Sequence, residues 1–177
     1  MNVNERIKSA IRDVPDFPKK GILFRDITPL LADPALCRDM VTEMKQQSDG
    51  LALDAVIGIE SRGFLFGMML AERLMIPFIP VRKVGKLPFK TVAHEYAMEY
   101  GSAIMEMHVD AVKPGMRILI HDDLLATGGT AAAAAELVNL QGGHVTSFSF
   151  IIALDSLGGR QRLLTYSQNI QTLVTYS

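Results

Sequence analysis

The apolar positions of this chain fall into short blocks whose spacing changes from one block to the next. Residues 55–59, 78–81 and 117–121 are aliphatic runs with the length of buried strands. Residues 63–74 and 130–140 have the length and the residue preferences of helices. Because strands and helices alternate, the pattern predicts β-α-β units and a parallel sheet. We therefore expect an α/β fold with a mostly parallel central sheet flanked by helices.

Further elements are predicted on either side of this core. Residues 5–13 carry isoleucines one helical turn apart, and Asp33-Pro34 is typical of the start of a second helix. The proline-rich residues 14–29 are too apolar for a free linker, so we expect a hairpin-like segment that packs on the rest. Residues 83–95 are predicted to be a long loop. Strands are expected after it at 96–100, 103–108 and, as the last core strand, 145–154.

Composition narrows the class of protein. A chain of 177 residues with 49% hydrophobic content fits one domain, residues 1–177, with a sizeable core. Its formal net charge of −1 provides no basic surface, which argues against nucleic acid as a partner. Cys37 is the single cysteine, so an internal disulfide and a multi-cysteine zinc site are excluded. Because we find neither a signal peptide nor a run of about 18 apolar residues, we expect a cytoplasmic protein without a membrane partner.

One segment, residues 118–130, joins the end of a predicted strand to the start of a predicted helix. It contains the adjacent Asp122 and Asp123, here called the diacid, and then a loop of small residues. Unpaired N–H groups and the dipole at a helix N-terminus favour a bound phosphate, and carboxylates accept hydrogen bonds from vicinal hydroxyls. We therefore interpret the segment as a site for ribose 5-phosphate. Its predicted ligands are the diacid and the phosphate loop, which consists of Ala126, Thr127, Gly128, Gly129 and Thr130.

Two other phosphate-binding motifs are excluded by their chemistry. Gly58 and Gly63 have the spacing of the glycines in a Walker A loop, but Phe64 occupies the position of the essential lysine. No G-x-G-x-x-G motif follows a predicted strand, which argues against a dinucleotide site of the usual kind.

A second loop, residues 58–64, also lies between a predicted strand and a predicted helix. Loops that follow parallel strands open at the same edge of a sheet, so this pyrophosphate loop is expected to face the ribose site. Arg62 offers paired N–H donors to two pyrophosphate oxygens. A surface ion pair between Arg62 and Glu60 is the alternative interpretation.

Residues 122–130, Asp-Asp-Leu-Leu-Ala-Thr-Gly-Gly-Thr, resemble the phosphoribosyl pyrophosphate signature of the type I phosphoribosyltransferases and look most like the adenine branch of that family. The resemblance implies a three-layer fold with a small N-terminal hood at about residues 14–30. The implied reaction converts adenine and phosphoribosyl pyrophosphate into AMP and pyrophosphate, as in purine salvage. A homodimer is also implied, and so is Mg²⁺ carried by the substrate, with contact through water to Asp122 or Asp123.

The same resemblance implies roles for residues around the expected site. Residues 83–95 would form a closing loop, and His94 and Tyr100 would belong to the mobile region. The Glu60-Ser61 bond is the candidate for a cis peptide. Pyrophosphate would be bound by Glu60, Ser61, Arg62, Arg82, Lys83 and Lys86.

Adenine and catalysis are assigned in the same way. The ring of Phe24 would stack on the base, and main-chain groups of Leu23 and Arg25 would contact its edge. Leu154 would cover the other face. The catalytic residues implied are Glu99, Asp122 and Asp123; His94 and Glu95 remain alternatives to Glu99 as the proton donor.

Two other functions stay open at this point. An enzyme of the same family acting on hypoxanthine, guanine, xanthine or orotate would share the ribose 5-phosphate site. A nucleotide-binding transcriptional regulator of the same fold is the second alternative, although the chain has neither an extra DNA-binding domain nor a basic face.

Overall fold

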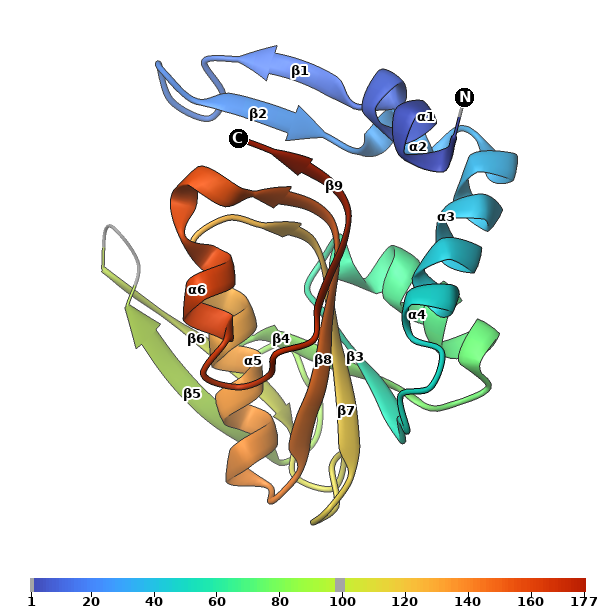
Figure 1. Cartoon of the computed structure of the whole chain (residues 1–177). Coiled ribbons are helices and arrows are strands. Elements are labelled where there is room, and N and C mark those ends of the chain that lie inside the picture. Colours follow the sequence, from blue (N-terminus) through green and yellow to red (C-terminus); the bar gives the residue numbers. More distant parts are fainter. Residues whose placement is uncertain (1, 98–100) are drawn as a thin grey trace.

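In a computed structural model, which describes residues 2–97 and 101–177, the chain forms a central sheet with helices on both faces (Figure 1). The seven strands lie in the order β5-β6-β4-β3-β7-β8-β9. Only β6 runs antiparallel to its neighbours in this described sheet, so the expected mostly parallel sheet is confirmed. The strands are β3 (Ala55–Ile59), β4 (Phe78–Lys83), β5 (Thr91–Ala97), β6 (Ser102–His108), β7 (Arg117–Leu125), β8 (His144–Leu154) and β9 (Ile170–Tyr176).

Helices cover the two faces of this sheet. One face packs against α1 (Val3–Ala10), α3 (Pro34–Gln47) and α4 (Gly63–Leu74), and the other against α5 (Gly129–Leu140) and α6 (Gly159–Leu163). The expected start of α3 is confirmed, because the Asp33 side chain accepts a hydrogen bond from the Leu36 N–H and Pro34 is the first helical residue. Each face therefore has its own apolar cluster, as a three-layer α/β fold requires.

The N-terminal hood is a small separate sheet that lies over the edge where β7, β8 and β9 end (Figure 1). It consists of β1 (Arg12–Pro15) paired antiparallel with β2 (Leu23–Asp26), followed by the short helix α2 (Thr28–Leu31). The guanidinium of Arg25 lies 4.1 Å from the ring centroid of Tyr176, so a cation–π contact joins the hood to β9. The predicted helix over 5–13 is too long at its C-terminal end, because Ile11 already has an extended backbone.

Three predictions about secondary structure are corrected. Residues 91–97, expected to be part of a loop, form β5 along β6, and residues 98–100 of the strand predicted at 96–100 lie outside the described residues. This edge strand has one solvated side and therefore few apolar residues. β7 extends to Leu125 rather than ending at His121. Residues 145–154 are not the last core strand, because β9 follows with Leu173 and Val174 buried.

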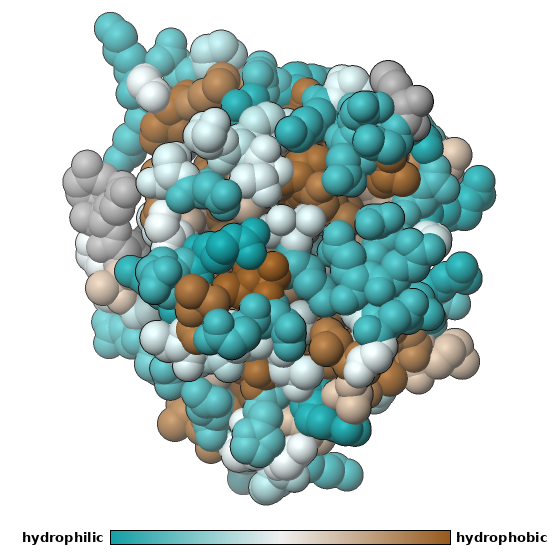
Figure 2. Space-filling model, viewed as in Figure 1, coloured by the Kyte–Doolittle hydropathy of each residue, from teal (hydrophilic) through white to brown (hydrophobic). Residues whose placement is uncertain are grey.

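The molecular surface gives little further indication of function. Figure 2 shows small apolar patches interspersed with hydrophilic side chains on the face viewed in Figure 1. Across residues 2–97 and 101–177, every helix is too short or too polar to cross a membrane.

Candidate active site

The C-terminal ends of three adjacent strands bring the predicted phosphate-binding residues together. Glu60 follows β3, Lys83 ends β4, and the diacid lies in β7, which pairs with β3. All of them line one cavity of about 580 Å³, together with Ser61, Arg62, Tyr96 and Thr130. This volume is ample for a nucleotide-sized ligand. The expectation that both loops open at the same edge of the sheet is confirmed.

The diacid is part of a strand and is largely withdrawn from water. Asp123 is only 4% exposed, and its N–H donates to Asp122 Oδ1 at 2.9 Å. Burial and the charge of Asp123 raise the pKa of Asp122 well above its usual range. Burial also raises the pKa of Asp123, although the Arg62 guanidinium opposes this shift. Two adjacent carboxylates in a partly desolvated cavity concentrate negative charge at one point, where a developing cation would be stabilised.

Arg62 connects the pyrophosphate loop to the diacid. Its Nε lies 3.0 Å from Asp123 Oδ2, so Arg62 pairs with the diacid and the alternative of a pair with Glu60 is wrong. The Arg62 guanidinium also lies 5.2 Å from the ring centroid of Phe24 in the hood. One side chain therefore contacts both the diacid and a predicted adenine-binding residue.

Glu60 gathers the cations of the site around its carboxylate. Arg82 donates to it through Nη2 at 3.1 Å and Nε at 3.3 Å, and Lys86 donates through Nζ at 3.1 Å. The backbone N–H of Lys83 donates to it at 3.0 Å. Burial would raise the pKa of Glu60, but these hydrogen bonds outweigh it and lower the pKa to about 2. Glu60 therefore contacts cations that an anionic ligand would need. The Glu60-Ser61 bond is cis, as the family resemblance implied.

The phosphate loop surrounds a small cavity of about 80 Å³ at the start of α5. The Ala132 N–H donates to Gly128 O at 2.9 Å, so the N–H groups before it have no partner within the helix. Gly128 has a φ of 76°, a conformation that favours glycine. Gly159 of α6 packs against this loop, and a Cβ there would lie 2.1 Å from Ala126 O. The loop thus lines this cavity and packs on its other side against Gly159.

The predicted adenine-binding residues lie around the hood and the end of β8. Phe24 makes an edge-to-face contact with Phe17 at a centroid distance of 5.1 Å. Leu23 is 46% exposed, while the Arg25 side chain is occupied by Tyr176 and by an ion pair with Asp13. Leu154 packs at the edge of the apolar cluster that also includes Tyr176. Arg62 therefore lies between Phe24 and the diacid and contacts both. Leu154 instead contacts the apolar core.

The expected mobile residues are only partly described. Glu99 and Tyr100 lie outside the described residues. His94 is in β5 and lines a second cavity of about 510 Å³ beside α5 and α6, rather than the main cavity. Tyr96 borders both cavities, and its hydroxyl lies 3.3 Å from the Thr130 hydroxyl. Glu95 accepts a hydrogen bond from Ser102 Oγ.

Sequence reasoning missed three residues that organise the site: Tyr96, Glu106 and Tyr176. Glu106 is 4% exposed and accepts hydrogen bonds from the connection between β4 and β5 and from Thr91 of β5. A lone carboxylate in the apolar run Ile104-Met105-Glu106-Met107 was an available signal for a buried, hydrogen-bonded charge. For Tyr176 the only signal was the β-branched and aromatic residues of the segment 170–176, in which apolar and polar residues do not alternate regularly.

Comparison with known proteins agrees with this geometry. The family model described as phosphoribosyl transferase domain matches residues 27–172. An adenine phosphoribosyltransferase of Cytophaga hutchinsonii is 51% identical over 174 residues, which are 98% of this chain and 96% of the relative. The crystal structure of adenine phosphoribosyltransferase from Thermoanaerobacter pseudethanolicus is 47% identical, with a TM-score of 0.94 and coverage of 98% of this chain and 99% of that chain.

A third similar protein was crystallised with ligands. The adenine phosphoribosyltransferase of Saccharomyces cerevisiae, complexed with D-2,5-dideoxy-2,5-imino-altritol 1,6-bisphosphate and adenine, is 38% identical. Its TM-score is 0.90, and the match covers 97% of this chain and 98% of that chain.

Proposed function

This chain belongs to the phosphoribosyltransferase family, and we propose that it catalyses the reaction of the adenine-specific members, converting adenine and phosphoribosyl pyrophosphate into AMP and pyrophosphate. The observation that carries the proposal is that the diacid, Arg62, Lys83 and Thr130 of the phosphate loop line one cavity with Glu60, to which Arg82 and Lys86 are paired. The identity of 51% to a curated adenine phosphoribosyltransferase supports adenine over another base.

The ribose 5-phosphate end of the substrate would lie between the diacid and the phosphate loop. N–H groups at the start of α5 and the Thr127 and Thr130 hydroxyls are the donors for the phosphate. Carboxylate oxygens of Asp122 and Asp123 are the acceptors for the two ribose hydroxyls. Both sets of groups border neighbouring cavities that share Asp122 and Thr130.

The pyrophosphate end would lie over Ser61 and Arg62, within reach of Arg82, Lys83 and Lys86. Guanidinium and ammonium groups bind such a polyanion through charge-assisted hydrogen bonds. Glu60, which was expected to bind pyrophosphate, has the wrong charge for direct contact. It acts on pyrophosphate through Arg82 and Lys86, whose head groups it holds.

Magnesium fits the donors of this cavity. Mg²⁺ prefers carboxylate, phosphate and water oxygens and is commonly bound by one or two carboxylates together with substrate phosphates. Asp122 or Asp123 would contact it through water, and the cation would neutralise charge on the leaving pyrophosphate. The residues of the chain hold the ribose, exclude water and stabilise positive charge at the anomeric carbon.

Bond breaking to pyrophosphate leaves an oxocarbenium-like ribose, which the diacid in its ionised form would stabilise. A ring nitrogen of adenine then attacks from the hood side. Phe24 supplies a ring for stacking, with main-chain groups of Leu23 and Arg25 at the edge of the base and Leu154 on its other face. Glu99 remains our candidate for the proton transfer.

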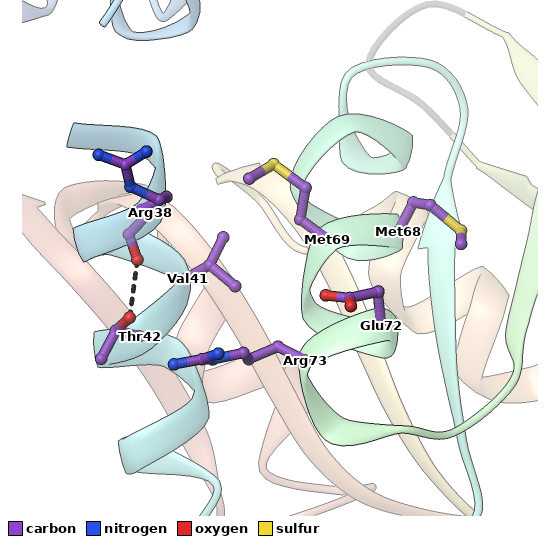
Figure 3. Close-up of a pocket in the computed structure, with 7 residues that line it drawn as sticks. All are labelled: Arg38, Val41, Thr42, Met68, Met69, Glu72 and Arg73. Atoms are coloured by element: carbon purple, nitrogen blue, oxygen red, sulfur yellow. Dashed lines mark hydrogen bonds between the residues drawn. The ribbon is translucent and has the colours of Figure 1, made fainter. Parts of the chain in front are cut away.

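A homodimer is part of this proposal, and α3 and α4 offer a surface for it. Figure 3 shows Val41 of α3 facing Met69 of α4 across a groove of about 460 Å³. Met68 is 52% exposed and Met69 is 36% exposed. The rim carries Arg38, Glu72 and Arg73, charges of both signs that can pair when the same surface meets itself about a two-fold axis. A sedimentation experiment showing only a 19.4 kDa species at full activity would contradict the dimer.

The reaction itself is tested with a panel of bases. Adenine, hypoxanthine, guanine, xanthine and orotate are each incubated with phosphoribosyl pyrophosphate and Mg²⁺, and nucleotide formation is measured. We expect AMP from adenine and far slower turnover of the others. Turnover of another base would identify a different member of the family, and binding without any turnover would favour a regulator. A cytoplasmic location stays a prediction.

A further inference from the structure

Glu106 is a buried carboxylate that accepts hydrogen bonds from the connection between β4 and β5 and from the first residue of β5. It lies in β6, opposite Arg82 of β4 in the antiparallel register. Its Oε1 accepts the backbone N–H groups of Lys86 and Leu87, each at 3.1 Å. Its Oε2 accepts the hydroxyl of Thr91 at 3.1 Å. This one side chain therefore holds the middle of the connection and the start of β5.

These contacts fix the backbone of Lys86 while leaving its head group accessible. Glu106 accepts the Lys86 N–H, and the Lys86 carbonyl accepts a hydrogen bond from Arg82 Nη1 at 2.9 Å. The Lys86 side chain is 51% exposed, and Nζ reaches Glu60 at 3.1 Å. Lys86 is thus constrained at both of its peptide groups, and its ammonium contacts Glu60, which lines the main cavity.

Without the contacts of Glu106, the backbone of this turn could adopt many conformations. Residues 83–90 contain three lysines and Gly85, whose φ of 83° is a conformation that favours glycine. The buried carboxylate offsets this freedom, because leaving the N–H groups of Lys86 and Leu87 without partners would carry a desolvation penalty. Within the closing loop expected over 83–95, the backbone at Lys86 and Leu87 is therefore tied to the sheet, and residues 91–95 belong to β5.

We propose that Glu106 is a positioning residue for pyrophosphate, which it never touches: by fixing the turn at Lys86 and Leu87 it sets the place of the Lys86 and Arg82 head groups. This role rests on the proposed function of those cations. This role should affect the binding of phosphoribosyl pyrophosphate but not that of adenine. The pyrophosphate end depends on the turn, whereas adenine would be held by the hood around Phe24. Fixing cations before the ligand arrives lowers the ordering cost of binding.

The test compares Glu106→Ala with Glu106→Gln. In the glutamine variant Oε1 still accepts both N–H groups and the amide NH₂ can donate to Thr91, so it should behave like the wild type. In the alanine variant we expect KM for phosphoribosyl pyrophosphate and the calorimetric Kd for magnesium pyrophosphate to rise ~10- to 100-fold, with KM for adenine within about twofold of wild type. Hydrogen exchange should speed up at the Lys86 and Leu87 amides.

Asp54→Ala is the matched control. Asp54 also accepts a backbone N–H, that of Arg117 at 2.8 Å, but it precedes β3 at the opposite end of the sheet. The Asp54→Ala variant should be less stable than the wild type, but the ratio of its KM for phosphoribosyl pyrophosphate to its KM for adenine should not change. An equal rise of both KM values in Glu106→Ala, or no change in either, would refute the positioning role.

Two further outcomes are decisive. If Glu106→Ala does not fold, the wild-type enzyme still gives an answer, because rapid exchange of both the Lys86 and Leu87 amides without ligand would contradict a fixed turn. If the wild-type enzyme forms no AMP and does not bind magnesium pyrophosphate, the proposed function fails and the role of Glu106 fails with it. If the wild-type enzyme forms AMP and Glu106→Ala has unchanged KM values, the proposed function stands and only the role of Glu106 is refuted.

Discussion

Arg62 Nε lies 3.0 Å from Asp123 Oδ2, so the loop expected to bind pyrophosphate is paired with the diacid expected to bind ribose. Asp123 is nearly inaccessible to water, and the Arg62 side chain is 38% exposed. The pair therefore joins a buried anion to a cation that still reaches the cavity. Because the two loops come from different strands, this contact couples the two ends of the proposed substrate site.

Asp122→Asn and Asp123→Asn should each slow the reaction while leaving the protein folded. Loss of a charge-assisted hydrogen bond costs about 1.5–3 kcal/mol, which corresponds to roughly one to two decades in kcat/KM for phosphoribosyl pyrophosphate. Steady-state kinetics with thermal melting as a folding control make the measurement. A folded variant with wild-type kinetics would remove that aspartate from the site.

The diacid should also determine the acid side of the pH profile. Its pKa values are raised, so kcat/KM should begin to fall, as pH is lowered, at a higher pH than an ordinary aspartate would give. The negative charge of Asp123 contributes to the raised pKa of Asp122. In Asp123→Asn the pKa of Asp122 should be lower, so the fall of kcat/KM at acid pH should occur at a lower pH than in the wild type. If kcat/KM falls at the same pH in the variant and the wild type, other groups cause the fall.

Tyr96→Phe tests the contact between β5 and the phosphate loop. The Tyr96 hydroxyl lies 3.3 Å from Thr130 Oγ1, and removing a neutral hydrogen bond should raise KM for phosphoribosyl pyrophosphate ~3- to 10-fold. KM for adenine should not change. Tyr166→Phe is the control, since its hydroxyl donates to Glu136 at 2.5 Å outside the main cavity. Equal effects of the two variants would argue against a specific role of Tyr96.

His121 should make the fold sensitive to mild acid. Its ring is fully buried, and no described side chain satisfies its two ring nitrogens. Burial lowers the pKa of His121 to about 4, although the nearby Ser149 backbone opposes the shift. Because the unfolded chain binds a proton below its ordinary pKa near 6.5, stability should be lost as pH falls from there to about 4.

Protonation of His121 in the unfolded chain should lower the free energy of unfolding by up to about 3 kcal/mol over this pH range. Urea unfolding at several pH values across this window measures it. His121→Leu should flatten the pH dependence, whereas replacing the exposed His144 by glutamine should leave it unchanged. The same acid sensitivity in His121→Leu and the wild type would assign it to other groups.

Local pattern was enough to predict much of this protein. The strands at 55–59 and 78–81, the helices beginning near Gly63 and Thr130, and the adjacency of the diacid to the phosphate loop all depend on residues close together in sequence. Parallel β-α-β connections then place the loops after β3 and β7 at one edge of the sheet. The family and its reaction were indicated by the resemblance of residues 122–130 to the signature of the type I phosphoribosyltransferases.

Contacts between distant segments were decided only by the tertiary structure. Sequence spacing allowed Arg62 to pair with Glu60, but the fold brings it to Asp123 and gives Glu60 to Arg82 and Lys86. β5 and β9 are strands because β6 and β8 supply their hydrogen-bond partners, which a half-polar pattern does not reveal. Glu106 and Tyr176 acquire their roles in the same way. A side chain chooses its partner by geometry and burial, and both of these arise only when the chain has closed its long-range contacts.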